Sequence, residues 1–418
     1  MHSMLFLTSI AAFAFTLPPL VQDPEWPDFR GPLWNGHALE ANLPLEWSED
    51  KNVSWKTAVP GMGWSSPVVG GGRVWFTTAD EDGATMSVLA LDLESGAIVI
   101  ERVLIENDEP EKRNALNSYA SPSCVIGDGR VYVHFGSYGT FCVDAKSGET
   151  LWSRRDMECD HMEGPGSSPV LWSDKLIVNA DGGDQQYVIA LDAKTGKTKW
   201  KTERSVDHGD RKPDMRKAYS TPIIIELAGK ERLFSSGAEA TFAYDPKNGK
   251  EVWSVRHSGF SMSSRPVSDG EVVYLNTGFM KPNWLAVRVS GRGDVTSKNV
   301  LWTYTRGVPT IPSPLLVGDR LYYTSNGGVV TCLDVDKGED VWRERIDGEH
   351  CASPIYASGR LYFFDREGRS VVLGVGDKFV VLGRNQLDAG FMASPAVVGD
   401  ALVLRTKTHV YRVEEVGG

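Results

Sequence analysis

A small residue followed by proline recurs along the chain at intervals of 40–55 residues, and this repeat constrains the fold more than any other feature. Each copy opens a short apolar run, which leads through a turn, usually glycine-bearing, into an alternating run of β-branched and aromatic residues. Such runs are typical of β-strands. The eight copies, in one of which an arginine replaces the small residue, are Ser66-Pro67, Ser121-Pro122, Ser168-Pro169, Thr221-Pro222, Arg265-Pro266, Ser313-Pro314, Ser353-Pro354 and Ser394-Pro395.

In four copies, the second half of the repeat contains an Asp, a Gly four residues later and a Trp eight residues after the Asp. Asp144, Gly148 and Trp152 are one such set, in which the carboxylate can accept backbone N–H groups of a turn and the glycine tolerates positive φ. Four short strands per copy, at this period, are typical of propeller blades. The repeat predicts an all-β, eight-bladed β-propeller of four-stranded antiparallel blades. The tryptophans expected to pack blade against blade are Trp55, Trp152, Trp200, Trp253, Trp302 and Trp342.

The two ends of the repeat complement each other. Residues 53–59 read as a fourth strand without the first three, whereas the segment after Ser394 contains three strands without a fourth. We therefore expect an N-terminal strand to complete the last blade, which would remove the open edges of an unclosed ring. The predicted organisation is a signal peptide at 1–22, an extension at 23–52 that packs on the propeller, and a single propeller at 53–418.

Charge and composition exclude several classes of partner. The net charge is −11 and the pI is near 5.3, which argues against nucleic acid and anionic lipid as partners. No apolar run after residue 22 is long enough to span a bilayer. The apolar, uncharged segment 4–22 ends near two prolines and predicts export to the periplasm or the extracellular space. The five cysteines form no C-x-x-C motif, and we expect buried thiols.

Four blocks of the repeat resemble those of a known family. The blocks are CVDAKSGETLW (142–152), IALDAKTGKTKW (189–200), AYDPKNGKEVW (243–253) and CLDVDKGEDVW (332–342). They resemble the tryptophan-docking repeats of the quinoprotein alcohol dehydrogenase-like propellers, and the resemblance covers roughly residues 53–415. That superfamily includes enzymes that use pyrroloquinoline quinone (PQQ) and the cofactor-free outer-membrane assembly lipoprotein BamB. The WPDFRGP and GWSSP segments are similar to secreted planctomycete PQQ-like repeat proteins.

Departures from the dehydrogenase pattern favour a scaffold over an enzyme. The chain has no adjacent Cys-Cys pair and no C-x-x-C-H haem site, and the Glu, Asn and Asp side chains that hold calcium beside the quinone in the family match no motif here. We therefore expect no cofactor and no catalytic residue. A PQQ-dependent dehydrogenase with calcium and a divergent site remains the alternative, because the superfamily contains both enzymes and scaffolds.

Long charged loops between blades, at 101–120, 153–166 and 203–220, should lie on one face of the propeller, where function usually resides. His161, His208, His257 and His350 lie among carboxylates in such loops, so a metal site is one interpretation and solvated loop residues are the favoured one. Asp181 and Asp184 lie on a predicted turn, where a calcium site is one interpretation and a solvated turn is the favoured one.

Basic side chains near these loops and near the blade starts form a possible rim that could bind an anionic glycan. Aromatic residues before the inner strands either bind a flat ligand or plug the channel. The expected function is a binding or assembly scaffold whose loop face holds a protein or a glycan, while outer strand edges could accept an extended peptide. The candidate ligand-binding residues are Trp64, Arg113, Asn117, Tyr119, His161, Glu163, His208, Arg216, Tyr219, Arg265, Arg306, His350 and Met392.

Overall fold

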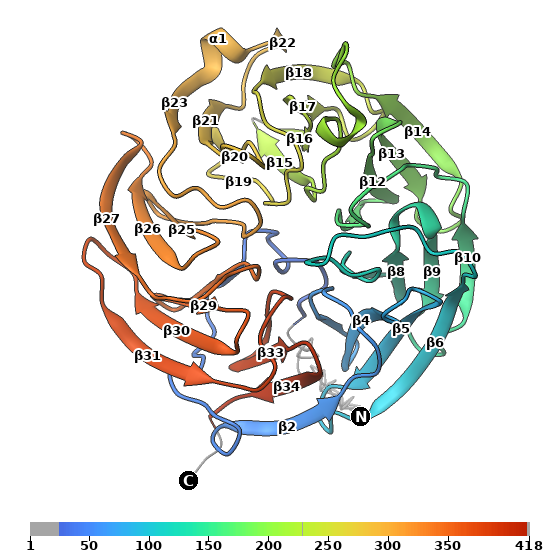
Figure 1. Ribbon diagram of the computed structural model, residues 1–418, viewed down its shortest axis with the longest axis vertical. Helices are drawn as coiled ribbons and strands as arrows, with labels where there is room; N and C mark the ends of the chain where they lie inside the picture. Colours follow the sequence, from blue (N-terminus) through green and yellow to red (C-terminus); the bar gives the residue numbers. More distant parts are fainter. Residues whose placement is uncertain (1–24, 228, 416–418) are drawn as a thin grey trace, which may run out of the picture.

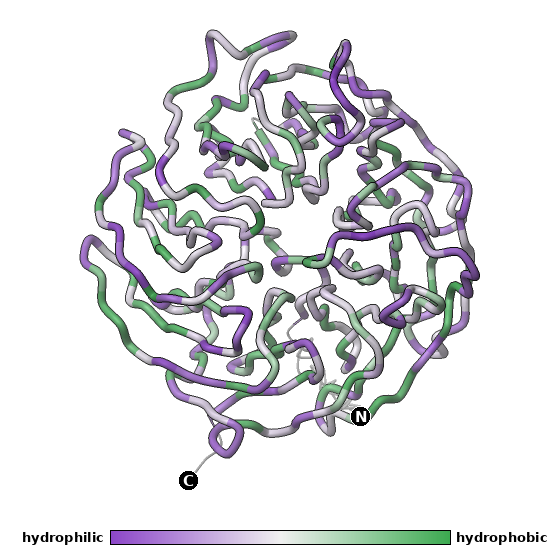
Figure 2. Tube along the Cα trace, viewed as in Figure 1, coloured by the Kyte–Doolittle hydropathy of each residue, from purple (hydrophilic) through white to green (hydrophobic). Residues whose placement is uncertain are grey.

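The computed structural model describes residues 25–227 and 229–415, and the predicted eight-bladed propeller is confirmed (Figure 1). Each blade is a four-stranded antiparallel sheet whose first strand lies nearest the axis. Figure 2 shows hydrophobic stretches along the strands and hydrophilic ones in many of the peripheral turns and loops. Within the described residues, no helix is long and apolar enough to cross a membrane. The predicted signal peptide at 1–22 lies outside the described residues.

The first four blades follow the chain in order. Blade one contains β3 (Val68–Gly70), β4 (Arg73–Ala79), β5 (Thr85–Asp92) and β6 (Ile98–Glu106). Blade two contains β7 (Val125–Gly127), β8 (Arg130–His134), β9 (Thr140–Asp144) and β10 (Thr150–Arg154), with the 3₁₀ turn η1 (Gly136–Tyr138). Blade three contains β11 (Val170–Trp172), β12 (Lys175–Asp181), β13 (Gln186–Asp192) and β14 (Thr198–Glu203), followed by η2 (Pro213–Met215). Blade four contains β15 (Ile223–Leu227), β16 (Lys230–Gly237), β17 (Ala240–Tyr244) and β18 (Glu251–Arg256).

The other four blades complete the ring. Blade five contains β19 (Val267–Ser268), β20 (Val272–Asn276), β21 (Trp284–Arg288) and β23 (Val300–Tyr304); its long loop contains α1 (Thr296–Asn299) and β22 (Gly293–Asp294), which pairs with β18. Blade six contains β24 (Leu315–Val317), β25 (Arg320–Thr324), β26 (Val329–Asp334) and β27 (Glu339–Arg345). Blade seven contains β28 (Ile355–Ala357), β29 (Arg360–Phe364), β30 (Arg369–Gly374) and β31 (Val381–Gln386). Blade eight contains β32 (Ala396–Val398), β33 (Ala401–Arg405), β34 (His409–Val413) and β2 (Val53–Ala58).

The ring closes as the sequence predicts. The strand β2 pairs antiparallel with β34, with Val53 opposite Val413 and Ala58 opposite His409. Strands from the two ends of the chain therefore share one blade, and Figure 1 shows β2 on its outer edge. Because β2 is the fourth strand of the last blade, the closure joins the chain ends to the core.

Blade two corrects one detail of the predicted register. In every blade, the inner strand begins two residues after one particular position, which is Ser123 in blade two rather than Ser121. The proline of the repeat is replaced there by Cys124, so the nearby Ser121-Pro122 pair gives a false match two residues too early. The error arises because the repeated feature is a backbone position. Its hydrogen bonds define that position in the structure, and a proline does not have to follow it.

The repeat tryptophans connect neighbouring blades. Trp152 Nε1 donates to the carbonyl of Ala193 at 3.0 Å, and a Cβ placed on Gly196 would lie 2.7 Å from the Trp152 ring. The glycine at φ +71° thus provides both the turn and the room for the indole. Nε1 atoms of the other repeat tryptophans, Trp55, Trp200, Trp253, Trp302 and Trp342, donate in the same way to backbone carbonyls of the next blade.

Blade seven has Gly383 where six of the blades have the tryptophan, and the N-terminal segment packs at this position. The carbonyl of Leu45 contacts Gly383, and Asn385 binds the Trp47 N–H at 2.8 Å. The Trp47 ring is 3% exposed and stacks 6.4 Å from Tyr362. In blade two, the same second-strand position is occupied by a tyrosine that contacts the blade's own tryptophan at 6.1 Å. Trp47 therefore substitutes for the missing indole of blade seven.

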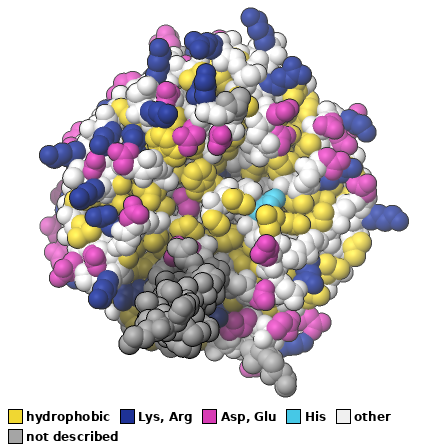
Figure 3. Space-filling model, turned by 180° about the vertical axis from the view of Figure 1, so that it is seen from behind, with side chains coloured by type: hydrophobic (Ala, Val, Ile, Leu, Met, Phe, Trp, Pro, Cys, Tyr) yellow, Lys and Arg dark blue, Asp and Glu magenta, His cyan; other side chains and the backbone are white. Residues whose placement is uncertain are grey.

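The N-terminal segment, residues 25–52, also crosses the inner edges of several blades. Trp26 forms a β-bridge with Val69, and β1 (His37–Ala38) pairs in parallel with β28. Asn42 contacts Asp400 at a turn between the first two strands of blade eight, which lies on the side away from the inter-blade loops. Figure 3 shows the molecule from behind the view of Figure 1, with acidic and basic side chains interspersed over that side.

Candidate functional site: an axial cavity with a hydroxyl ring

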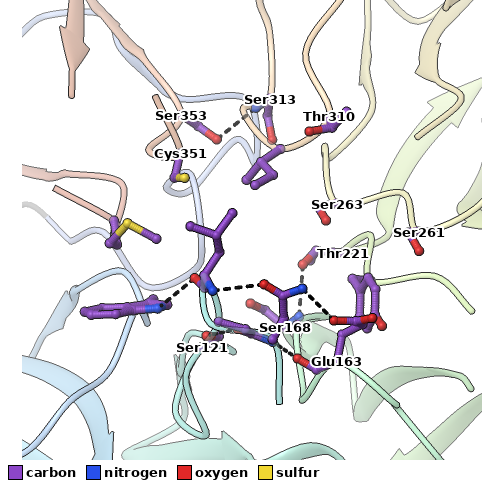
Figure 4. Close-up of a pocket in the computed structure, with 18 of the residues that line it drawn as sticks. Ser121, Glu163, Ser168, Thr221, Ser261, Ser263, Thr310, Ser313, Cys351 and Ser353 are labelled. Atoms are coloured by element: carbon purple, nitrogen blue, oxygen red, sulfur yellow. Dashed lines mark hydrogen bonds between the residues drawn. The ribbon is translucent and has the colours of Figure 1, made fainter. Parts of the chain in front are cut away.

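A cavity of about 440 Å³ lies where the eight blades meet, and residues of the inter-blade loops form its walls (Figure 4). Residues that precede the inner strands line its deeper part, and Phe29 of the N-terminal segment lines it as well. Because every inter-blade loop runs from an outer strand back to the axis, loops far apart in sequence converge here. The cavity is therefore the structural counterpart of the predicted loop-face site.

A ring of seven hydroxyl groups surrounds the deep part of this cavity. In each case, the backbone N–H of one blade donates to the hydroxyl oxygen of the next, as Ser313 does to Ser353 at 3.0 Å. The chain of bonds continues around the axis with lengths of 2.9–3.0 Å. We call this set the hydroxyl ring; its members are Ser66, Ser123, Ser168, Thr221, Ser313, Ser353 and Ser394.

Arg265 occupies the eighth position and interrupts the ring. Its backbone N–H still donates to Ser313 Oγ at 2.9 Å, but its side chain binds the Pro222 carbonyl and the Asp28 carboxylate, the latter at 3.0 Å. Burial raises the pKa of Asp28 to about 6, although the adjacent guanidinium acts to lower it. The arginine thus connects the N-terminal segment to the propeller, and its side chain is fully buried.

Loops 153–166 and 203–220 supply the charged groups of the cavity. Lys217, which is 3% exposed, pairs with Asp214 and lies 3.4 Å from Glu163. Glu163 also accepts a bond of 2.7 Å from the Asn114 amide, and Asn117 donates to its backbone carbonyl. The carboxylates are therefore held by neighbours rather than free to act as general bases.

The mouth of the cavity is apolar and partly exposed. Phe279 is 50% exposed and contacts the buried Phe260 edge-to-face, with ring centroids 5.9 Å apart. Leu116 is 44% exposed, and its carbonyl accepts a bond of 3.1 Å from Trp64 Nε1. Met392 lines the same cavity. The mouth can therefore bury an apolar part of a ligand.

The structure brings together part of the predicted set of binding residues. Five of them line the cavity: Trp64, Asn117, Glu163, Tyr219 and Met392. Others support the loops, since Arg113 donates to the carbonyls of Asn117 and Glu81, Tyr119 OH donates to Glu111, and Arg216 donates to Arg211. Sequence reasoning missed the hydroxyl ring and did not select Lys217 as a ligand-binding residue. The recurring Ser or Thr before each proline was the available signal, but it was interpreted only as a marker of the repeat.

The four loop histidines do not converge on the axis. His161 is buried, and burial lowers its pKa to about 4. His208 binds Glu239 at 2.9 Å, and His350 lies with its ring nitrogens 2.9 Å from two backbone carbonyls. Asp181 is committed to Arg204 through two bonds of 2.9 and 2.6 Å. Within residues 25–227 and 229–415, no three His, Cys, Asp or Glu side chains gather closely enough to hold a metal ion.

Partners also neutralise much of the predicted basic rim. Arg306 pairs with Asp340 at 2.6 Å, Arg211 pairs with Glu239 at 2.8 Å, and Arg265 and Lys217 are paired as described above. Arg265 and Arg204 are buried rather than part of a rim. Arg113 and Arg216 bind only backbone carbonyls, so their charges have no carboxylate partner among the described residues. The predicted rim is thus neutralised in part, because a paired guanidinium already donates its hydrogen bonds to a carboxylate.

PQQ and its calcium ion require a lining that can pair several charges. PQQ carries three carboxylates, and its metal needs several oxygen ligands. The described lining supplies one ammonium, already paired with two carboxylates, and no cluster of metal ligands. Cys351 lines the cavity as a single thiol, and burial raises its pKa to about 11. The residues present therefore do not fit the quinone with its metal.

Comparisons with known proteins agree with the fold. Over 220 residues, 48% of this chain, it is 29% identical to a quinoprotein ethanol dehydrogenase of Pseudomonas aeruginosa; over 141 residues, 30% of this chain, it is 33% identical to the quinohemoprotein alcohol dehydrogenase ADH IIB of Pseudomonas putida. These matches span only 31% and 18% of those relatives' own lengths.

Solved structures give the same architecture. BamB of Moraxella catarrhalis matches with a TM-score of 0.53 at 18% identity, over 73% of this chain and 81% of that one. A europium-containing methanol dehydrogenase matches with a TM-score of 0.66 at 13% identity, over 93% and 89%. The family model described as outer membrane protein assembly factor BamB matches residues 45–221 and 184–418. The chain therefore belongs to the family of the outer membrane protein assembly factor BamB and has its PQQ-like propeller fold.

Proposed function

We propose that the protein is an exported, non-catalytic binding or assembly module that holds its partner in the axial cavity on the inter-blade loop face. The observation that carries the proposal is the lining of that cavity, where hydroxyl and amide groups lie beneath an apolar mouth. Such a lining is typical of recognition sites, in which a few polar groups orient a ligand and apolar surface supplies affinity.

The competing function, a quinone-dependent dehydrogenase, is favoured by the named relatives but not by the chemistry of the site. A dehydrogenase of that class needs a metal beside the quinone and a free base. Here both carboxylates of the cavity contact Lys217, and the thiol of Cys351 is protonated at neutral pH because burial raises its pKa to about 11. The scaffold function of BamB relatives is therefore the better match.

Site-specific photocrosslinking in the native host tests which face binds the partner. A photoreactive side chain would replace Phe279 at the cavity mouth, and in a matched variant it would replace Leu39, which is 57% exposed and belongs to the N-terminal segment on the other side. We expect a discrete adduct from position 279 and none from position 39. Equal labelling at both positions, or adducts only at 39, would overturn the proposed binding face.

A further inference from the structure

The hydroxyl ring has protons without a partner. All seven hydroxyl-bearing residues are at most 5% exposed, and each hydroxyl oxygen accepts one backbone N–H. Among the described residues, none of the seven hydroxyl groups has an acceptor for its own proton. A buried donor that lacks an acceptor costs free energy, and here each one borders the cavity. The ring therefore presents donors to whatever occupies the axis.

One sector of the ring lies next to a buried positive charge. Arg30 donates at 2.6 Å to the carbonyl of Pro314 and at 3.3 Å to that of Pro354, the residues that directly follow Ser313 and Ser353. Arg30 is 2% exposed, and its Nε has no partner. Within residues 25–227 and 229–415, it forms no ion pair with a carboxylate.

The neighbouring carboxylate of Asp28 does not balance this charge, because its bond of 3.0 Å goes to Arg265. Burial lowers the pKa of Arg30 to about 9, which reflects the cost of an uncompensated charge. The ring sector at Ser313 and Ser353 thus combines two free hydroxyl donors with a nearby unpaired cation. Charge-assisted hydrogen bonds are the strong ones in proteins, so an oxyanion is the complementary group.

The side chains in the outer part of the cavity restrict the kind of ligand that can bear this oxyanion. The exposed apolar side chains Leu116 and Phe279 lie at the mouth, and the only charged groups of the lining, Lys217 with its two carboxylates, are already paired. A ligand with several charges would leave some of them without partners at this apolar mouth. A ligand with a single oxyanion and an apolar body can bind the hydroxyl ring at one end of the cavity and the apolar mouth at the other.

We propose that Ser313 and Ser353, above Arg30, bind the carboxylate of a ligand whose apolar portion rests against Leu116 and Phe279. This inference rests on the proposed function of the cavity and names the chemistry of its ligand. The carboxylate belongs either to the C-terminus of a protein chain or to a free aliphatic acid, and the two sources differ in whether peptide groups are needed for binding.

Ligand-detected NMR titration of the full protein tests the proposal with three probes: an N-acetylated tetrapeptide that ends in leucine with a free carboxylate, its C-terminal amide, and hexanoate. We expect the peptide acid to bind at least tenfold more tightly than the amide, because the amide lacks the charge. Tight binding of the peptide acid without hexanoate assigns a chain terminus. Comparable binding of hexanoate assigns a free acid.

Matched alanine variants locate the site. Ser353→Ala and Ser168→Ala each remove one ring bond, of 3.0 and 2.9 Å, so their effects on folding should be alike. Only Ser353→Ala should weaken binding of the peptide acid, by about tenfold, whereas Ser168→Ala should stay within twofold. Equal effects of the two variants, equal binding of acid and amide, or no binding of any probe would overturn the carboxylate site. Equal acid and amide binding would leave the loop-face function intact.

Discussion

Replacing Trp47 by alanine should destabilise the propeller as much as removing a tryptophan from one of its own blades. The indole is 3% exposed and stacks on Tyr362 and Phe364 at centroid distances of 6.4 and 6.5 Å. Its Nε1 has no partner, so the loss consists of packing and not of a hydrogen bond. Truncation of a buried tryptophan costs about 3–5 kcal/mol, because it leaves a cavity beside Tyr362 and Phe364.

Equilibrium unfolding in urea measures this cost, and Leu39→Ala is the matched control because Leu39 belongs to the same segment and is 57% exposed. We expect a lower midpoint for Trp47→Ala and less than about 0.5 kcal/mol for the control. A Trp47→Ala protein within about 1 kcal/mol of the wild type would refute the conclusion that the N-terminal segment completes blade seven.

Three further predictions concern the core. Arg204→Met should cost about 3–5 kcal/mol in urea unfolding because it leaves Asp181 buried and unpaired, and replacing Asp181 by leucine as well should recover most of that loss. Trp253→Phe should cost about 1–2 kcal/mol by the same measurement, since it removes a bond of 2.8 Å to the next blade. Burial lowers the pKa of His134 to about 3 and that of His161 to about 4, so the unfolded chain takes up protons first as the pH falls below 6.5. The free energy of unfolding should therefore decrease from pH 7 to pH 4, by roughly 2 kcal/mol per histidine at pH 5. His134→Gln should make the free energy of unfolding depend less steeply on pH.

The fold could be predicted from the sequence because each blade repeats the same local chemistry. A turn that contains Asp144 and Gly148, followed by Trp152, specifies one blade edge without any information from distant residues. Closure by residues 53–59 could be predicted for the same reason, since an incomplete set of strands at each end leaves one arrangement without open edges.

The candidate site could be predicted only in part, because it depends on how loops meet. Glu163 and Tyr219 lie 56 residues apart in sequence and share the cavity only through loop conformation. His161 has the residue type of a metal ligand, yet it is buried beneath a loop. Arg30 belongs to no repeat, and its place beside Ser313 depends on a segment whose path follows no periodic pattern.

Calorimetric titration of the protein with PQQ, with and without calcium, tests the central claim of a non-catalytic module most directly. The lining contains no cluster of metal ligands among the described residues, so we expect no calcium-dependent binding. Tight, saturable binding that requires calcium would contradict the account and would identify the protein as a quinone-dependent enzyme with a divergent site.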